Sequence, residues 1–136
     1  MSRFFSSSPL WQTGGLTLIR LIVGSFMIYH GIEVFSEEKM NGYIQWDMFK
    51  GSSFAKRMVY AGKGSELVGG LLLFLGLCTR IAALLLACTM LYISLFVGEG
   101  RIWYEDQHPF LFVLLALVFF FTGGGKWSAD CLLFKK

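Results

Sequence analysis

Residues 67–97 read LVGGLLLFLGLCTRIAALLLACTMLYISLFV and form two apolar runs that are separated only at Thr79 and Arg80. A helix needs about 20 mainly apolar residues to cross the hydrocarbon core of a bilayer. The first helix of this pair is expected to begin before its apolar run. We therefore predict two membrane spans, at about residues 59–77 and 81–97, joined by a minimal turn.

Apolar runs on either side of this segment complete the predicted bundle. One covers about residues 16–35, and the other covers about 109–121, where Pro109 suits the first turn of a helix. The predicted fold class is an all-α membrane protein, with a single domain over residues 1–136. We expect a bundle of four transmembrane helices with a short turn on the side of the termini and an interfacial loop between the first two helices.

The composition excludes a water-soluble domain of this size. Hydrophobic residues make up 55% of the 136 residues and charged residues 15%, whereas soluble domains contain about 25% charged residues. A small soluble domain has too little interior to hide so much apolar surface, so we expect a lipid bilayer as the environment. The basic residues are scattered and form no stripe, which argues against nucleic acid as a partner.

The only sizeable loop, at residues 36–58, carries aromatic residues between charged ones: Tyr43, Trp46, Phe49 and Phe54. Aromatic side chains are enriched in the headgroup layers of a membrane. We interpret the segment as an interfacial lid, with a gate for a ligand as the alternative.

Ionisable residues interrupt the predicted spans at Arg20, His30, Lys63 and Glu66, and these are the candidate site residues. A charged side chain inside a span costs about 2.5–3.5 kcal/mol on insertion scales, so such residues are commonly functional. Arg20 and Glu66 fall on helix stripes of small residues and should face neighbouring helices rather than lipid. Glu33 is expected near the membrane surface, in contact with solvent.

Two partners compete for Glu66. Arg20 shares the small-residue stripes, whereas His30 matches Glu66 better in depth and in side-chain direction. We favour the pair of Glu66 with His30. The four residues form either a ligand-binding site or a buried structural network, since buried polar groups commonly satisfy one another. A separate structural ion pair is predicted between Arg80, in the tight turn, and Asp130, after the last span.

Enzyme signatures such as a P-loop or a nucleophile elbow are absent, and we assign no catalytic residue. His30 and His108 are too few for a zinc site, which takes three or four protein ligands, so no metal is expected. Cys78, Cys88 and Cys131 lack the CxxC spacing of redox or metal sites. Whether the protein takes part in catalysis is left open.

Several short motifs together resemble the DoxX family of small membrane proteins. The early motifs are Arg20-Leu21 with Gly24 and then His30-Gly31, and the late motif is Gly124-Gly125-Lys126-Trp127-Ser128-Ala129-Asp130. The most specific motif runs from Glu66 through Gly69-Gly70 and Gly76 to Thr79-Arg80-Ile81-Ala82-Ala83. The sequence departs from the usual pattern at Glu33, where a basic residue is common, and at Gln107-His108, where an acidic residue is common.

The resemblance implies four helices, a bacterial cytoplasmic (inner) membrane and cytoplasmic termini. The basic residues divide almost evenly between the two faces, so the positive-inside rule alone gives a near tie, and we favour cytoplasmic termini. The family takes its name from a subunit of a thiosulfate:quinone oxidoreductase.

Three functions remain open. The first is a non-catalytic accessory subunit of a respiratory or redox membrane complex, with other membrane subunits as partners. The second is a quinone- or lipid-binding component of a membrane oxidoreductase, with a pocket at His30 and Glu66 and quinone as the ligand. The third is a small transporter or proton path through the same residues. We rank them in this order, because fold membership alone carries little information about function.

Overall fold

The computed structural model describes residues 6–134, and every regular element in this range is helical. The longer helices are α1 (Gln12–Gly31), α3 (Ala55–Leu75), α4 (Thr79–Tyr92) and α5 (Gln107–Thr122). Shorter elements are the 3-10 helix η1 (Ile32–Phe35), α2 (Glu37–Ile44), the π-helix η2 (Ile93–Val97) and α6 (Ala129–Leu133). The all-helical prediction is confirmed for the described part of the chain.

Three helical segments are long and apolar enough to cross a membrane: Gln12–Phe35, Ala55–Leu75 and Thr79–Val97. The fourth apolar helix, α5, has only 16 residues. At a rise of 1.5 Å per residue it is about 24 Å long, which is less than the hydrocarbon core of about 30 Å. The fourth crossing therefore stays a prediction.

When η1 is counted with α1 and η2 with α4, helix ends differ from the predicted ones by up to four residues. α1 begins at Gln12 rather than at residue 16, and α3 begins at Ala55 rather than at 59. The four residues added to α1 are polar or small, and those added to α3 include Lys56 and Arg57, so hydropathy alone does not include them. α3 ends before Gly76, whose φ of 67° is left-handed and favours glycine.

The four longer helices pack in chain order, and glycines bring α1 and α3 closest together. A Cβ atom added to Gly24 would lie only 2.8 Å from the backbone of Phe74, and one added to Gly70 would lie 2.8 Å from the backbone of Ile28. Gly31 likewise lies against the backbone of Leu67. Small residues at such positions let membrane helices approach closely, so the contact of α1 with α3 is fixed by backbone packing.

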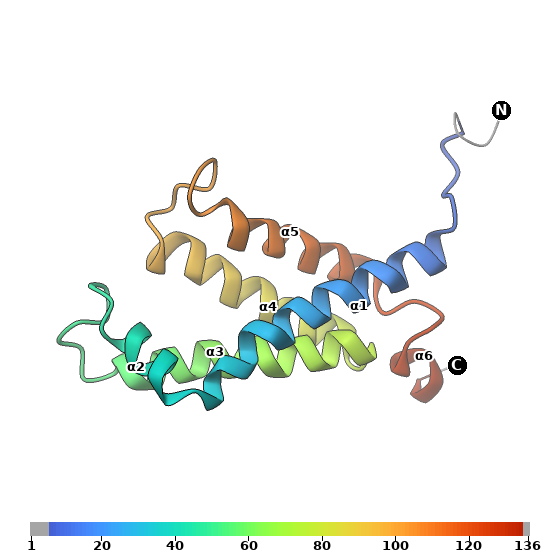
Figure 1. Ribbon diagram of the computed structural model, residues 1–136. Coiled ribbons are helices and arrows are strands. Elements are labelled where there is room, and N and C mark those ends of the chain that lie inside the picture. The colour runs from blue at the N-terminus through green and yellow to red at the C-terminus, as the bar shows by residue number, and fades with distance from the viewer. Residues whose placement is uncertain (1–5, 135–136) are drawn as a thin grey trace.

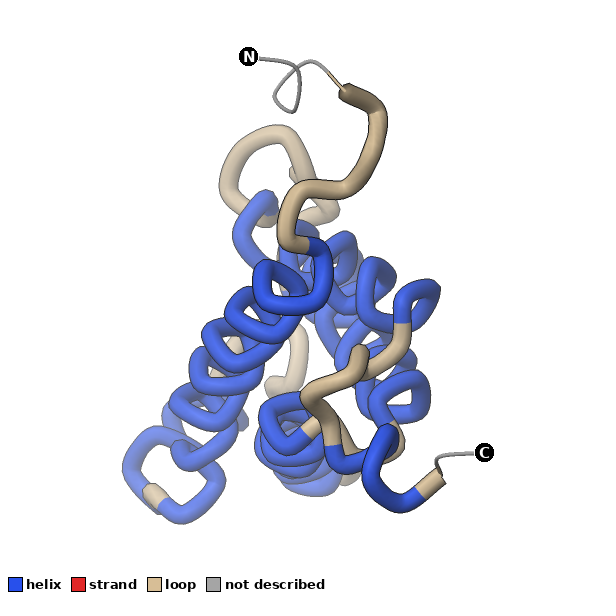
Figure 2. The backbone as a smooth tube through the Cα atoms, turned by 90° about the vertical axis from the view of Figure 1, so that its right-hand side faces the viewer, coloured by secondary structure: helices blue, strands red, loops and turns tan. Residues whose placement is uncertain are grey.

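The first and last of the longer helices, α1 and α5, do not pack closely against each other. They make few contacts with each other, whereas α1 packs on α3, and α5 packs on α4. Figures 1 and 2 show that α1 and α5 diverge toward the end of the bundle that carries α2. The start of α1 and the short α6 lie at the opposite end (Figure 1).

The segment between α1 and α3 is more ordered than the predicted loop, because it contains α2. Met40 of α2 is fully buried, and Phe49, in the turn that follows, is also buried. Both belong to a small apolar cluster with Ala55 and Val59 of α3. The segment therefore covers one end of the bundle as a packed cap.

Candidate functional site

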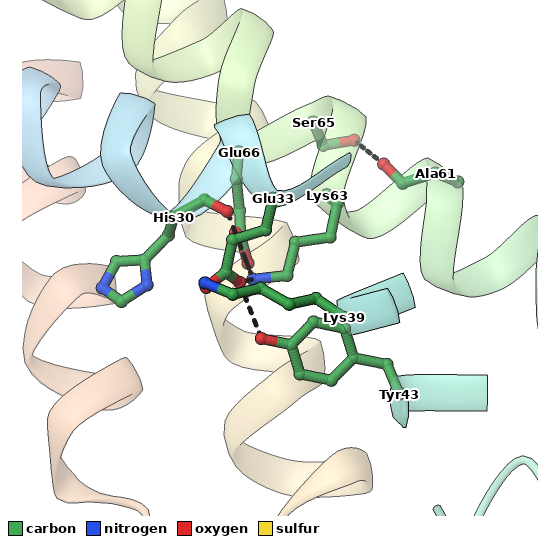
Figure 3. A network of polar contacts seen from close by, with 8 residues as sticks. All are labelled: His30, Glu33, Lys39, Tyr43, Ala61, Lys63, Ser65 and Glu66. Atoms are coloured by element: carbon green, nitrogen blue, oxygen red, sulfur yellow. Dashed lines mark hydrogen bonds and ion pairs between the residues drawn. The ribbon is translucent and has the colours of Figure 1, made fainter. Parts of the chain in front are cut away.

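A network of charged side chains joins η1, α2 and α3 beneath this cap (Figure 3). The Lys63 Nζ atom lies 3.0 Å from Glu66 Oε2 and 3.0 Å from Glu33 Oε2. Glu33 also pairs with Lys39, at 2.9 Å, and accepts a hydrogen bond of 2.6 Å from the hydroxyl of Tyr43. Two carboxylates and two ammonium groups thus balance each other's charge.

Exposure increases along the network from inside the bundle to the surface. The side chain of Glu66 is 4% exposed, those of Lys63 and Glu33 are each 14% exposed, and that of Lys39 is 55% exposed. The chain of ion pairs therefore connects a buried carboxylate with the surface near α2.

A cavity of about 570 Å³ lies beside Lys63 and Glu66. Ligand pockets in proteins commonly measure about 300–1,000 Å³ and combine apolar walls with a few polar groups. Apolar residues form most of the wall here, including Met27, Val59 and Ile93, and the last of these belongs to the π-helix. Single π-helical turns are frequent at functional sites. The cavity suits an apolar molecule that carries a polar group at one end.

The cap forms part of the same cavity through Tyr43, Trp46 and Phe49. Burial raises the pKa of the Tyr43 hydroxyl above its usual value, and its hydrogen bond to Glu33 acts in the same direction. Tyr43 therefore stays protonated and keeps donating to Glu33 at neutral pH. Its bond ties the cap to the charged network.

The predicted pair of Glu66 with His30 is wrong. The His30 ring points away from the carboxylate (Figure 3) and lies against His108, with ring centroids 6.5 Å apart. Glu66 pairs instead with Lys63, which stands one turn earlier on the same helix. Residues three apart on a helix are neighbours, so the long lysine side chain reaches Glu66 without any contact between helices.

The alternative pair of Glu66 with Arg20 is also absent. Arg20 is 2% exposed and donates hydrogen bonds to three backbone carbonyl groups. These belong to Leu73 and Phe74, at the end of α3, and to Trp127. The last carbonyl groups of a helix lack partners within it, and the guanidinium group supplies them here. Arg20 thus acts as a structural clamp at the opposite end of the bundle from the cavity.

Asp130 does not form the predicted ion pair with Arg80. Its two carboxylate oxygens accept hydrogen bonds from the backbone N–H groups of Cys78, at 2.5 Å, and Thr79, at 2.8 Å. Burial alone would raise the pKa of Asp130, but these hydrogen bonds and the charge of Arg20 hold it below the usual value. The unpaired N–H groups at the start of α4 compete better for the carboxylate than the exposed Arg80 side chain does.

The structure thus brings together Lys63 and Glu66 of the predicted site, keeps His30 on the cavity wall, and places Arg20 elsewhere. Sequence reasoning missed Tyr43 and Lys39 as members of the network and treated Glu33 as a solvated surface residue. For the pair of Lys63 with Glu66, the sequence did contain a signal, because residues three apart on a helix are neighbours. Within residues 6–134 no group of three or more potential ligand side chains is placed to hold a metal ion.

Comparison with known proteins relates the chain to one family. A family model described as DoxX matches residues 15–99. An "Uncharacterized protein" of Haemophilus influenzae is 32% identical, over 89% of this chain and 92% of its own length. A Bacillus subtilis protein named "Putative oxidoreductase CatD" is 30% identical, over 89% of this chain and 88% of its own length. No solved structure shows a significant match.

Proposed function

This chain belongs to the DoxX family, and we propose that it is a membrane component of a redox assembly that holds a quinone-type head group in the cavity beside Lys63 and Glu66. The proposal includes four membrane crossings, with α5 as the fourth, and cytoplasmic termini in a bacterial inner membrane. Other subunits of the assembly supply the electrons.

The observation that carries the proposal is the position of the ion pair of Lys63 with Glu66 on the wall of an otherwise apolar cavity. A quinone has carbonyl oxygens that accept hydrogen bonds and a ring that prefers apolar surroundings. The ammonium group of Lys63 is a donor of suitable type, and aromatic side chains of the cap cover the ring. The name of the Bacillus subtilis relative contains the word oxidoreductase, which agrees with this chemistry.

The charged network favours proton exchange as a second function of the same site. Reduction of a quinone consumes protons as well as electrons, and its oxidation releases them. Glu66, Lys63 and Glu33 form a continuous series of polar contacts from the cavity toward the exposed Lys39. Protons can reach the head group along these side chains without crossing lipid.

The test is purification in a mild detergent, followed by mass spectrometry of extracted quinones and of co-purifying membrane proteins. We expect the wild-type protein to retain quinone and the Glu66→Gln and His30→Ala variants to lose it while remaining folded. Glu33→Gln is the matched control, because Glu33 also pairs with Lys63 but does not line the cavity.

Each outcome assigns a different function. Retention of quinone by Glu33→Gln but not by Glu66→Gln supports binding at the cavity. A wild-type protein that holds no quinone yet co-purifies with a stable large complex would make it a non-catalytic accessory subunit. In that case Glu66→Gln should still complement a deletion strain fully.

A further inference from the structure

A second hollow, of about 520 Å³, lies on the outside of the bundle between α1 and α5. We call it the outer groove. It is lined by Ser25, Phe26, Tyr29 and His30 of α1 and by His108 and Phe112 of α5. Phe26 and Tyr29 are 52% and 70% exposed, so the groove opens to the surroundings of the bundle.

The outer groove and the inner cavity share one wall. His30, His108 and Phe112 line both of them. The rings of His30 and His108 lie 6.5 Å apart, and those of Phe26 and Phe112 lie 6.3 Å apart, each pair edge to face. Only side chains therefore separate the cavity from the groove at this position.

The contact between α1 and α5, which we call a seam, is made by side chains, whereas the seam between α1 and α3 is made by backbone packing. Glycines hold α1 and α3 at backbone contact, and a passage there would require the helices to separate. α1 and α5 make few contacts, and aromatic rings fill the space between them. Rotation of side chains about their bonds is much faster and needs less rearrangement than movement of packed helices.

We propose that the outer groove holds the hydrocarbon tail of the ligand whose head group occupies the cavity. This inference rests on the proposed function and adds to it the class of ligand and its route. The ligand is a bilayer-borne amphiphile, with a hydrogen-bond-accepting head group and a long apolar tail. It enters sideways from the lipid, past His30, His108 and Phe112, and its tail stays in the groove.

Three features support a tail over other occupants. The groove adjoins the cavity across the side chains that line both, and Lys63 and Glu66 line the cavity only, so a molecule spanning the two spaces would place its charged or strongly polar end in the cavity. The exposed groove residues Phe26 and Tyr29 offer aromatic surface. The groove also lies on a helix that is long and apolar enough to cross a membrane, where lipid-phase molecules have direct access.

Binding of two probes to the purified protein in phosphatidylcholine nanodiscs tests the inference. One probe is a decyl-tailed benzoquinone, and the other is the same benzoquinone without its tail. Ser25→Trp fills the outer groove, because Ser25 lines the groove but not the cavity. Ile22→Trp is the matched control on the same helix, since Ile22 is 47% exposed and lines neither space.

We expect Ser25→Trp to weaken binding of the tailed probe at least about tenfold, a difference of about 1.4 kcal/mol. Binding of the tailless probe should be unchanged, which also shows that the variant is folded. Ile22→Trp should bind both probes as the wild type does.

Other results overturn the inference. If Ser25→Trp binds the tailed probe with wild-type affinity, the tail does not use the groove. If Ser25→Trp weakens the binding of both probes equally, the substitution acts on the cavity rather than on the groove. If Ser25→Trp changes the oligomeric state of the protein, the groove is an interface between copies of the chain. If the wild type binds neither probe, the proposed function itself fails and this inference fails with it.

Discussion

The ammonium group of Lys63 lies 3.0 Å from the carboxylate of Glu66, so a buried acid of α3 has its counter-ion one turn away on the same helix. Glu66 is 3% exposed, and its charge is costly without a partner. Lys63 also contacts Glu33 of η1 and thereby joins the two helical segments. This pair links the stability of the bundle to the chemistry of the cavity.

Removing Lys63 should therefore destabilise the protein more than removing both members of the pair. Lys63→Met leaves the Glu66 carboxylate buried without its counter-ion, which costs about 3–5 kcal/mol in comparable cases. The double variant Lys63→Met/Glu66→Leu should regain most of this stability. Thermal unfolding in detergent measures the stability of the single and the double variant. Lys50→Met is the control, because Lys50 pairs only at the exposed surface. A double variant less stable than the single one would contradict the prediction.

Arg20→Lys should lower stability although it keeps the charge. Arg20 donates to three carbonyl groups from a planar fork, which a single ammonium group cannot reproduce. We expect a loss of at least about 2 kcal/mol, because hydrogen bonds to charged groups contribute about 1.5–3 kcal/mol each. Arg80→Gln is the control and should change stability by less than about 0.5 kcal/mol, as is usual for exposed sites. Equal effects of the two variants would remove Arg20 from its clamp role.

Asp130 should make stability depend on pH in the acidic range. Its pKa is held below the usual value of 3.8, so its contribution is present above that value and is lost as the pH falls through the lowered pKa. Asp130→Asn should be less stable at neutral pH by about 0.5–2 kcal/mol, like other lost helix caps. The difference from the wild type should begin to shrink only as the pH falls below 3.8, and it should disappear once the pH is below the lowered pKa of Asp130. Thermal unfolding of both proteins across pH measures it, and a constant difference down to acidic pH would refute the assignment.

Reporter fusions should decide whether α5 crosses the membrane. We expect fusions in the two connections, at residues 45–54 and 98–106, to give the same signal. A fusion at the C-terminal end should give the opposite signal. The first two should report the outer side of the membrane and the last the cytoplasm. A C-terminal signal that matches the fusion at 98–106 would show that α5 does not cross.

The sequence predicted the helical elements well because each depends on its own residues. Backbone polar groups must be satisfied within a membrane-spanning segment, so a long apolar run can only be helical there. The inward position of Arg20 and Glu66, predicted from the small-residue stripes, is confirmed by exposures of 2% and 3%. The cap was predicted only as a loop, because α2 begins with three charged residues and the burial of its Met40 depends on contact with α3.

Hydrophobicity and the small-residue stripes therefore determined the class of fold and the faces that turn inward. The tertiary structure decided which polar groups meet. Glu66 pairs with a residue of its own helix, and Arg20 and Asp130 each bind backbone groups at helix ends rather than the side chains predicted as their partners. The cavity and the seam between α1 and α5 also belong to the tertiary structure. They depend on how far each helix rotates and tilts around the glycine contacts, and no single segment of sequence contains that information.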